Sequence, residues 1–383
     1  MNRIDATAVI WGNDNYNVLG LLRQLSPFID NVIFLVNQRK NRCATWSRYC
    51  KKYVLAKTYE DGISFLKSFG NTLGNKGFLF TTNDTLAEYV DRNSNLLSHY
   101  YYLMGSKRQG LLTEMQGKSA MTKLADEIGF ITPRSLALKS VTNIDTIVYP
   151  CVVKPDNQTN KYKCNFKIRH FENKNELESF QQGMDKDDKY IVQQFIKKEK
   201  EYLLYGCRLL TGEVIIPGTI EKDRWHHGMI SSKIPQTVNL DLIKTFLEKI
   251  EFYGLFSFEF GLYDGKSYFF EVNLRNDGTS LYYFLGGANL PLLWVTSICG
   301  YKNFYSCSVR GESFFIDGIG DLPSALRGDI SLKKWWSDLK NADMYRHYSA
   351  KDKKPFLGVA MTNIPRMLIK YLLGLYKHQQ KDE

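Results

Sequence analysis

The sequence predicts an α/β fold that begins with a small parallel sheet. Three apolar stretches have the length and composition of strands, namely "ATAVIWG", "NVIFLV" and "KGFLFTT". Helical patterns, "NVLGLLRQLSPF" and "DTLAEYVDRN", follow the first and the last of them. Strands that alternate with helices form parallel sheets. The first strand ends at Gly12, but "GNDNYN" lacks the further glycines of a dinucleotide-binding turn, so that glycine indicates no nucleotide site by itself.

Composition places the chain among ordinary globular proteins. Its 383 residues are 44% hydrophobic and 24% charged, which indicates two or three domains. No apolar stretch approaches the roughly 20 residues of a membrane span, and the N-terminus has no signal-peptide pattern, so we expect a cytoplasmic protein. The seven cysteines are scattered without a C-x-x-C pair, which favours neither disulfides nor a zinc site.

The net charge of +11 would suit a polyphosphate partner. Lysines and arginines are spread along the chain, however, and no recognition-helix, RNA-binding or zinc-finger pattern accompanies them. We therefore expect no nucleic-acid partner. Small molecules that carry phosphate fit the charge equally well.

A polar row follows an apolar run in "SYFFEVNLRNDG". Glu271, Asn273 and Arg275 are two residues apart, so on a strand they project from the same face. Glu259 lies on a preceding strand pattern, "FSFEFGL", and Asp264-Gly265 between the two is a strong hairpin signal. Folding about that turn sets Glu259 roughly across from Glu271. The solvent face of an ordinary strand is the alternative explanation for such a row.

Two lysines stand at marked positions upstream. Lys118 precedes an amphipathic helix of about ten residues that Gly129 and Pro133 close. Lys154 is the only charge in the short strand "PCVVKP", where a lysine either reaches the surface or holds an anion. A further apolar strand, "KYIVQQFI", runs into a charged bend and then into the strand "EYLLYG".

These pieces, in this order from about Gly117 to Gly300, resemble the ATP-grasp enzymes. The carrying motifs are a lysine before a helix, V-V-K-P, Y-I-V-Q-Q-F-I with a glutamate eight residues after the first glutamine, and "FSFEFGLYDGKSYFFEVNLR". The final part is most similar to carboxylate-amine ligases of the D-aspartate ligase type. The resemblance implies a pre-ATP-grasp βαβ domain at 1–115 and an ATP-grasp domain at 116–305 with a lid at about 133–198. Residues 306–383 are expected to form a C-terminal helical extension.

The resemblance also implies the chemistry. Such ligases transfer the γ-phosphoryl group of ATP to a carboxylate, and an amine then attacks the acyl phosphate. Two facing carboxylates repel each other unless a cation lies between them. Glu259, Glu271 and Asn273 would therefore bind Mg²⁺ or Mn²⁺, a hard ion that prefers oxygen ligands. Arg275, planar and able to bind an anion through two N–H groups, would hold the phosphoryl group in transfer.

For ATP itself, the resemblance assigns phosphate contacts to Lys118 and Lys154. The strand end formed by Gln193, Gln194, Phe195 and Ile196 would pair its backbone with adenine. Glu201 would bind the ribose, with Glu199 as a close rival. The lid loop "DNQTNKYKCN" has no glycine, unlike many relatives, which leaves open how the lid closes.

A substrate-facing loop is implied at "EKDRWHHGMISS". Arg224, which we predict to be catalytic together with Arg275, could bind a carboxylate or phosphate there with His226 and His227, or these residues form a solvated loop. The partners would be a small-molecule carboxylate and an amine, for instance an amino acid added to a cell-envelope precursor. A carbamoyl-phosphate-synthase-like enzyme and a non-catalytic nucleotide-binding module remain as alternatives.

The C-terminal region carries no family motif. "SLKKWWSDLK" predicts an amphipathic helix whose tryptophan pair is buried. "PRMLIKYLLGLYK" sets Arg366, Lys370 and Lys377 on one helical face, with Leu368, Leu372 and Leu375 on another. Packing on the body or on a homo-oligomer partner is the favoured interpretation. Weak binding to an anionic membrane surface is the alternative.

Overall fold

The predicted N-terminal parallel sheet is confirmed. A computed structural model describes residues 3–37, 42–115, 117–139, 142–156, 166–185, 188–224, 226–301 and 307–373. Its first sheet has the order β3-β2-β1-β4-β5, all parallel. The strands are β1 (Ile4–Gly12), β2 (Ile29–Val36), β3 (Lys52–Leu55), β4 (Gly77–Thr81) and β5 (Tyr101–Leu103). The carboxyl ends of β1 and β4 therefore lie side by side, where ligands bind in such sheets.

Helices connect these strands: α1 (Tyr16–Leu25), α2 (Tyr59–Gly70), α3 (Asp84–Arg92) and the short α4 (Ser94–Leu97). Their starts follow local capping chemistry. The Asn15 side chain accepts the N–H groups of Asn17 and Val18 at the start of α1, and the Asn83 side chain accepts that of Leu86 in α3. The helix start at α3 thus comes directly after β4, which sets Asp84 at the carboxyl edge of the sheet.

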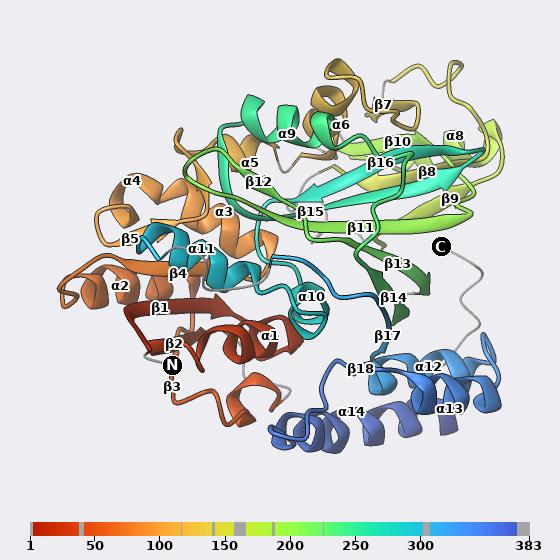
Figure 1. Ribbon diagram of the computed structural model, residues 1–383. Coiled ribbons are helices and arrows are strands. Elements are labelled where there is room, and N and C mark those ends of the chain that lie inside the picture. The colour runs from red at the N-terminus through yellow and green to blue at the C-terminus, as the bar shows by residue number, and fades with distance from the viewer. Residues whose placement is uncertain are drawn as a thin grey trace.

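A second, four-stranded sheet lies within the range predicted for the lid, and we call it the lid sheet. Its order is β7-β10-β8-β9, all antiparallel. The elements are β7 (Ser135–Leu138), β8 (Cys151–Pro155), β9 (Arg169–Phe171), α8 (Lys174–Gln182) and β10 (Tyr190–Gln194). Its own small core includes Val153, Leu177 and Val192. Residues 157–165, which include most of the glycine-free loop, lie outside the described residues. Figure 1 shows this sheet at one end of the molecule.

The largest sheet, which we call the base sheet, has nine strands and a main path of β16-β15-β11-β13-β14-β17-β18. The strands are β6 (Gly105–Ser106), β11 (Lys200–Arg208), β12 (Val214–Ile215), β13 (Thr219–Arg224), β14 (His227–Ser231), β15 (Phe252–Tyr263), β16 (Lys266–Asn273), β17 (Glu312–Ile316) and β18 (Met344–Tyr345). The predicted hairpin is present. Asp264 and Gly265 both have positive φ, 49° and 67°, which the tight β15–β16 turn requires.

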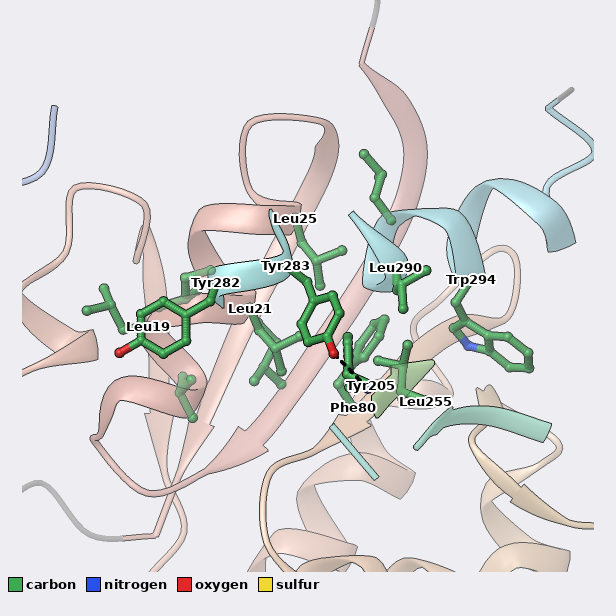
Figure 2. Close-up of a cluster of buried hydrophobic side chains, with 14 of the residues drawn as sticks. Leu19, Leu21, Leu25, Phe80, Tyr205, Leu255, Tyr282, Tyr283, Leu290 and Trp294 are labelled. Atoms are coloured by element: carbon green, nitrogen blue, oxygen red, sulfur yellow. Dashed lines mark hydrogen bonds between the residues drawn. The ribbon is translucent and has the colours of Figure 1, made fainter. Parts of the chain in front are cut away.

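Helices pack on this sheet and join it to the rest of the protein (Figure 1). They are α5 (Leu111–Met115), α6 (Lys118–Glu127), α9 (Leu240–Lys249), α10 (Ser280–Leu285) and α11 (Leu290–Ile298). The two tyrosines of α10 connect separate parts of one core, and Figure 2 shows them turned in different directions, with the Tyr283 hydroxyl toward Tyr205. That hydroxyl accepts the Tyr205 N–H at 3.1 Å and donates to the Leu203 carbonyl at 2.9 Å.

The C-terminal region supplies strands as well as the predicted helices, because β17 and β18 extend the base sheet. Its helices are α12 (Gly318–Arg327), α13 (Leu332–Asn341) and α14 (Lys354–Leu372). Burial of the tryptophan pair was predicted and is wrong. Trp336 is 52% exposed and Trp335 is half-buried. No residue of α13 is buried, so this helix lies on the surface. In the described residues, no helix combines the length and the apolar character needed to cross a bilayer.

Candidate active site

A row of three lysines and three glutamates lies along the base sheet. Glu259 and Glu271 are directly paired across β15 and β16, as the hairpin predicted. Lys118 Nζ lies 3.1 Å from Glu271 Oε2, and Lys222 Nζ lies 3.2 Å from Glu259 Oε2. Lys222 also contacts Glu201 Oε1 at 2.6 Å, and Lys198 contacts Glu201 Oε2 at 2.5 Å. In order, the row is Lys118, Glu271, Glu259, Lys222, Glu201 and Lys198.

Strand alternation and cross-strand pairing put these charges on one face. On β15, Phe258 and Phe260 enter the aromatic core, so Glu259 between them points the other way. On the neighbouring strands, Glu201 of β11 pairs with Lys222 of β13. A β-bulge between Glu259 and Phe260 adjusts the register beside the carboxylate pair, a common feature near functional sites.

The two paired carboxyl groups have different environments. The Lys118 ammonium lowers the pKa of Glu271 below its ordinary value. Burial raises the pKa of Glu259 above its ordinary value, and the neighbouring carboxylates of Glu271 and Glu201 add to the rise while Lys222 opposes it. The pair therefore carries a proton more readily than two isolated glutamates would. A cation placed between them would remove that cost.

The donor set fits a hard divalent cation. Glu259, Glu271 and the amide of Asn273 offer oxygen ligands, and the strand sets Asn273 beside Glu271 on the same face. Within the described ranges no group of three or more His, Cys, Asp and Glu side chains is arranged for a metal ion. Any ion here would thus complete its shell with amide, water or phosphate oxygens, which suits Mg²⁺ or Mn²⁺ better than zinc.

Arg275 connects this site to the N-terminal sheet. Its Nε donates to Asp84 Oδ1 at 2.6 Å and its Nη2 donates to Asn273 Oδ1 at 2.9 Å. Asp84 was not among the predicted site residues. The available signal was its position after β4, because the carboxyl ends of parallel strands gather ligand-binding groups. A second contact crosses the same boundary, where Asn17 Nδ2 donates to the Asn276 carbonyl at 3.2 Å.

The lid sheet brings Lys154 toward the row. Its Nζ donates to Gln193 Oε1 at 2.9 Å and lies 5.7 Å from the ring centre of Phe270 on β16. Burial lowers the pKa of Lys154 to about 8, and the positive charge of Lys118 contributes. Among the described residues, Lys154 therefore makes no ion pair with a carboxylate, whereas Lys118 pairs with Glu271.

At the strand predicted to bind adenine, two backbone N–H groups already donate hydrogen bonds within the protein. Gln194 N–H donates to the Arg134 carbonyl, and Phe195 N–H donates to the Pro150 carbonyl. Ile196 N–H makes no hydrogen bond to the part of the chain that the structure describes. Gln193 is buried in the middle of the lid sheet. Among the four residues predicted to bind adenine, Ile196 has the backbone donor best able to meet a base.

Glu199 and Glu201, the two rivals for the ribose, have separate surroundings. Glu199 accepts the Asp264 N–H at the β15–β16 turn, with an N···O distance of 3.1 Å. Glu201 belongs to the charged row, and its neighbouring lysines lower its pKa against the effect of burial. The geometry therefore favours Glu201 as the one that faces the site.

Arg224 is turned toward the C-terminal region. Its Nε and Nη2 donate to Asp321, and Nη2 also lies 2.9 Å from Asp338 Oδ2. Its neighbour Lys222 faces the carboxylate row instead, because a β-bulge separates the two residues. Lys222 was not among the predicted site residues, although it belongs to the predicted substrate-facing loop. The predicted catalytic role of Arg224 stays a prediction.

The two histidines of this loop are partly buried. His227 Nδ1 lies 3.1 Å from Asp223 Oδ2. Burial lowers the pKa of His226 to about 4, although Asp317 nearby acts in the opposite direction. At neutral pH, His226 is therefore uncharged and contributes no cation to an anion site.

Comparisons with known proteins agree on the architecture. No family model matches the chain, and no curated protein does. Among solved structures, the ADP complex of purK, N5-carboxyaminoimidazole ribonucleotide synthetase, is similar with a TM-score of 0.65 and 15% identity over 85% of this chain and 86% of that one. Staphylococcus aureus N5-carboxyaminoimidazole synthetase gives 0.66 and 15% over 86% of each chain.

The L-amino acid ligase from Bacillus licheniformis gives a TM-score of 0.62 and 13% identity over 82% of this chain and 80% of that one. At such identities the similarity establishes the fold. The finer resemblance to the D-aspartate ligase type stays a prediction. All three structures are of ATP-grasp enzymes, and the chain therefore has the ATP-grasp fold.

Proposed function

We propose that this protein is an ATP-dependent ligase that activates a carboxylate as an acyl phosphate and joins it to an amine. The observation that carries the proposal is the pairing of Glu259 with Glu271 between Lys118 and Lys222, with Lys154 approaching from the lid sheet. Cations on both sides of a carboxylate pair suit a triphosphate and its metal ion together.

Each residue of the candidate site has a separate proposed role. Lys154 and Lys118 contact phosphate oxygens, Ile196 N–H faces the adenine and Glu201 binds the ribose. Glu259, Glu271 and Asn273 would hold Mg²⁺ or Mn²⁺, which neutralises phosphate charge when bound. Lys222 bridges Glu259 and Glu201 and offsets their negative charge.

Arg275 holds the acyl phosphate at the boundary between the base sheet and the N-terminal sheet. Asp84 positions its guanidinium, because the Nε donates to that carboxylate. The acid and amine enter from this boundary. One of the similar structures is named as an L-amino acid ligase, which supports an amino acid as one substrate. We keep a cell-envelope precursor as the acceptor and the cytoplasm as the site of action.

The test is release of ADP. The purified protein is incubated with Mg²⁺-ATP and pools of amino acids and cell-wall intermediates, and ADP is measured against a no-acceptor control. The expected result is ADP release that needs one acid pool and one amine pool together. A Glu259→Gln/Glu271→Gln variant is the matched control. Tight ATP binding without turnover by any pool, equal in the control variant, would point to the nucleotide-binding module instead.

A further inference from the structure

Exposed apolar side chains are concentrated on α14. Among the described residues, twenty large hydrophobic side chains are exposed, and seven of them lie between Lys354 and Leu373. The seven are Leu357, Met361, Leu368, Ile369, Tyr371, Leu372 and Leu373. Scattered exposure of single hydrophobic residues is normal on a protein surface, whereas a cluster marks a surface that something covers.

The two halves of α14 differ. In the first half, Pro355, Gly358 and Val359 are buried, and a Cβ at Gly358 would lie 2.1 Å from the Arg42 carbonyl oxygen. From Pro365 to Leu373, only Met367 is partly buried, and Leu372 is 81% exposed. Packing on the body, which the sequence analysis favoured, thus accounts for the first half of the helix. It leaves the apolar second half uncovered. Figure 1 shows α14 at the outer edge of the molecule.

The helix has the amphipathic pattern of an interfacial segment. At 100° per residue, Leu357, Met361, Leu368 and Leu372 fall within an arc of about 60°. Arg366 and Lys370 project from the opposite side, near Leu373 at the end of the helix, and Ile369 lies between the two faces. Between Lys353 and Leu373 the sequence has four basic residues, Lys353, Lys354, Arg366 and Lys370, and no Asp or Glu. Apolar residues on one face with basic residues on the other are typical of helices that lie in a membrane surface.

We propose that the C-terminal half of α14 docks on the surface of an anionic phospholipid bilayer, with Leu368 and Leu372 entering the boundary of the acyl chains. Charge complementarity selects this occupant. A second copy of the helix offers the same cations and no carboxylate, whereas an anionic bilayer offers negative charge along the whole segment. The whole chain, with a net charge of +11, is attracted in the same direction.

The attachment is weak and reversible. Each basic residue near an anionic surface strengthens partitioning about fivefold, and salt screens that contribution. The exposed leucines add apolar burial that salt does not weaken. The surface is separate from the charged row of the base sheet, so docking does not depend on the ligase chemistry.

The experiment is co-sedimentation of the full-length protein with lipid vesicles. Vesicles of neutral phosphatidylcholine are compared with vesicles containing about 30% phosphatidylglycerol, each at about 50 mM and about 500 mM salt. We expect binding to the anionic vesicles at low salt, at least tenfold weaker binding at high salt, and little binding to neutral vesicles.

Variants separate the two faces of the helix. Leu368→Glu/Leu372→Glu should lower binding at least tenfold at either salt concentration. Arg366→Gln/Lys370→Gln should lower it about 25-fold at low salt and change it little at high salt. Leu55→Glu on β3, where Leu55 is 52% exposed, is the matched control and should bind like the unaltered protein. Melting temperatures that match the unaltered protein show that each variant folds.

Several outcomes would overturn the proposal. One is a full-length protein that does not sediment with anionic vesicles at low salt. Another is equal binding of the Leu368→Glu/Leu372→Glu variant and the Leu55→Glu control. A third is a variant that keeps its vesicle binding but changes from oligomer to monomer in sedimentation velocity, which would make the helix a contact between copies of this chain.

Discussion

The lid sheet and the base sheet hold their charges in different ways. On the base sheet, Lys222 contacts Glu259 and Glu201, and Lys118 of α6 contacts Glu271. On the lid sheet, Lys154 donates to the neutral amide of Gln193. The charges on the base sheet are therefore balanced by one another before any ligand binds. The lid sheet carries a cation that has no carboxylate partner among the described residues, and we expect it to gain a charged partner when an anion binds.

The largest effect is expected when a carboxylate of the base sheet is removed. Glu271→Gln removes a carboxylate from the proposed metal site and leaves Lys118 beside a neutral group, so turnover should fall about 1000-fold.

With the unaltered protein, ATP at about 100 times its dissociation constant should stabilise the fold by about 2.7 kcal/mol in Mg²⁺. In EDTA the gain should be much smaller. Thermal melts in the two conditions check this, and equal stabilisation would contradict the two-carboxylate site.

The next largest effect is expected at the boundary between the base sheet and the N-terminal sheet. Arg275→Ala should lower turnover about 100-fold and change ATP affinity by less than about threefold, because the guanidinium is assigned to the acyl phosphate. Asp84→Asn keeps the size of its side chain and should give a smaller loss of turnover. Steady-state kinetics and ATP titration measure the two quantities separately. If Arg275→Ala lost ATP affinity alone, its assigned role would be wrong.

Removing the lysine of the lid sheet should lower ATP affinity rather than turnover. Lys154→Ala removes a charge-assisted contact to phosphate, which is worth roughly 1.5–3 kcal/mol, or about 10- to 100-fold in ATP affinity. Turnover at saturating ATP should stay within a few-fold. Lys139→Ala, at an exposed residue directly after β7, is the control and should leave ATP affinity unchanged. An unchanged affinity in Lys154→Ala would remove the lid lysine from the site.

The contrast also predicts a pH dependence. The pKa of Lys154 in the folded protein is about 8, below its ordinary value of 10.5, so the folded state releases this proton more readily than the unfolded state. This residue's contribution to stability therefore falls as the pH drops from about 10.5 to 8. ATP needs the charged form, so ATP affinity should weaken up to about tenfold per pH unit above pH 8. Isothermal titration of Lys154→Met should show a flatter profile, and identical profiles would contradict the assignment.

The smallest effect distinguishes the two candidate ribose ligands. Glu201→Gln should weaken ATP binding by about tenfold or less, since it removes one acceptor and disturbs Lys222. Glu199→Gln should leave ATP affinity unchanged, because Glu199 caps the β15–β16 turn. Parallel ATP titrations decide between them. A loss in Glu199→Gln alone would exchange the two assignments.

The sequence by itself determined the features that depend on near neighbours. Alternation along β16 put Glu271 and Asn273 on one face, and Asp264-Gly265 specified the turn that pairs Glu259 with Glu271. Strand and helix patterns likewise predicted the parallel sheet, because each depends on a few consecutive residues. Lys154 stood out because it is a lone charge in an apolar strand.

Only the tertiary structure decided which distant residues complete the site. Lys222 meets Glu259 across 37 positions of sequence, and Asp84 meets Arg275 across 191. A β-bulge sends Lys222 and Arg224 to different partners, although alternation alone would put them on one face. On α14, one helical pattern covers a packed half and an exposed half. Such outcomes depend on which surfaces meet in three dimensions, and local periodicity carries no information about that meeting.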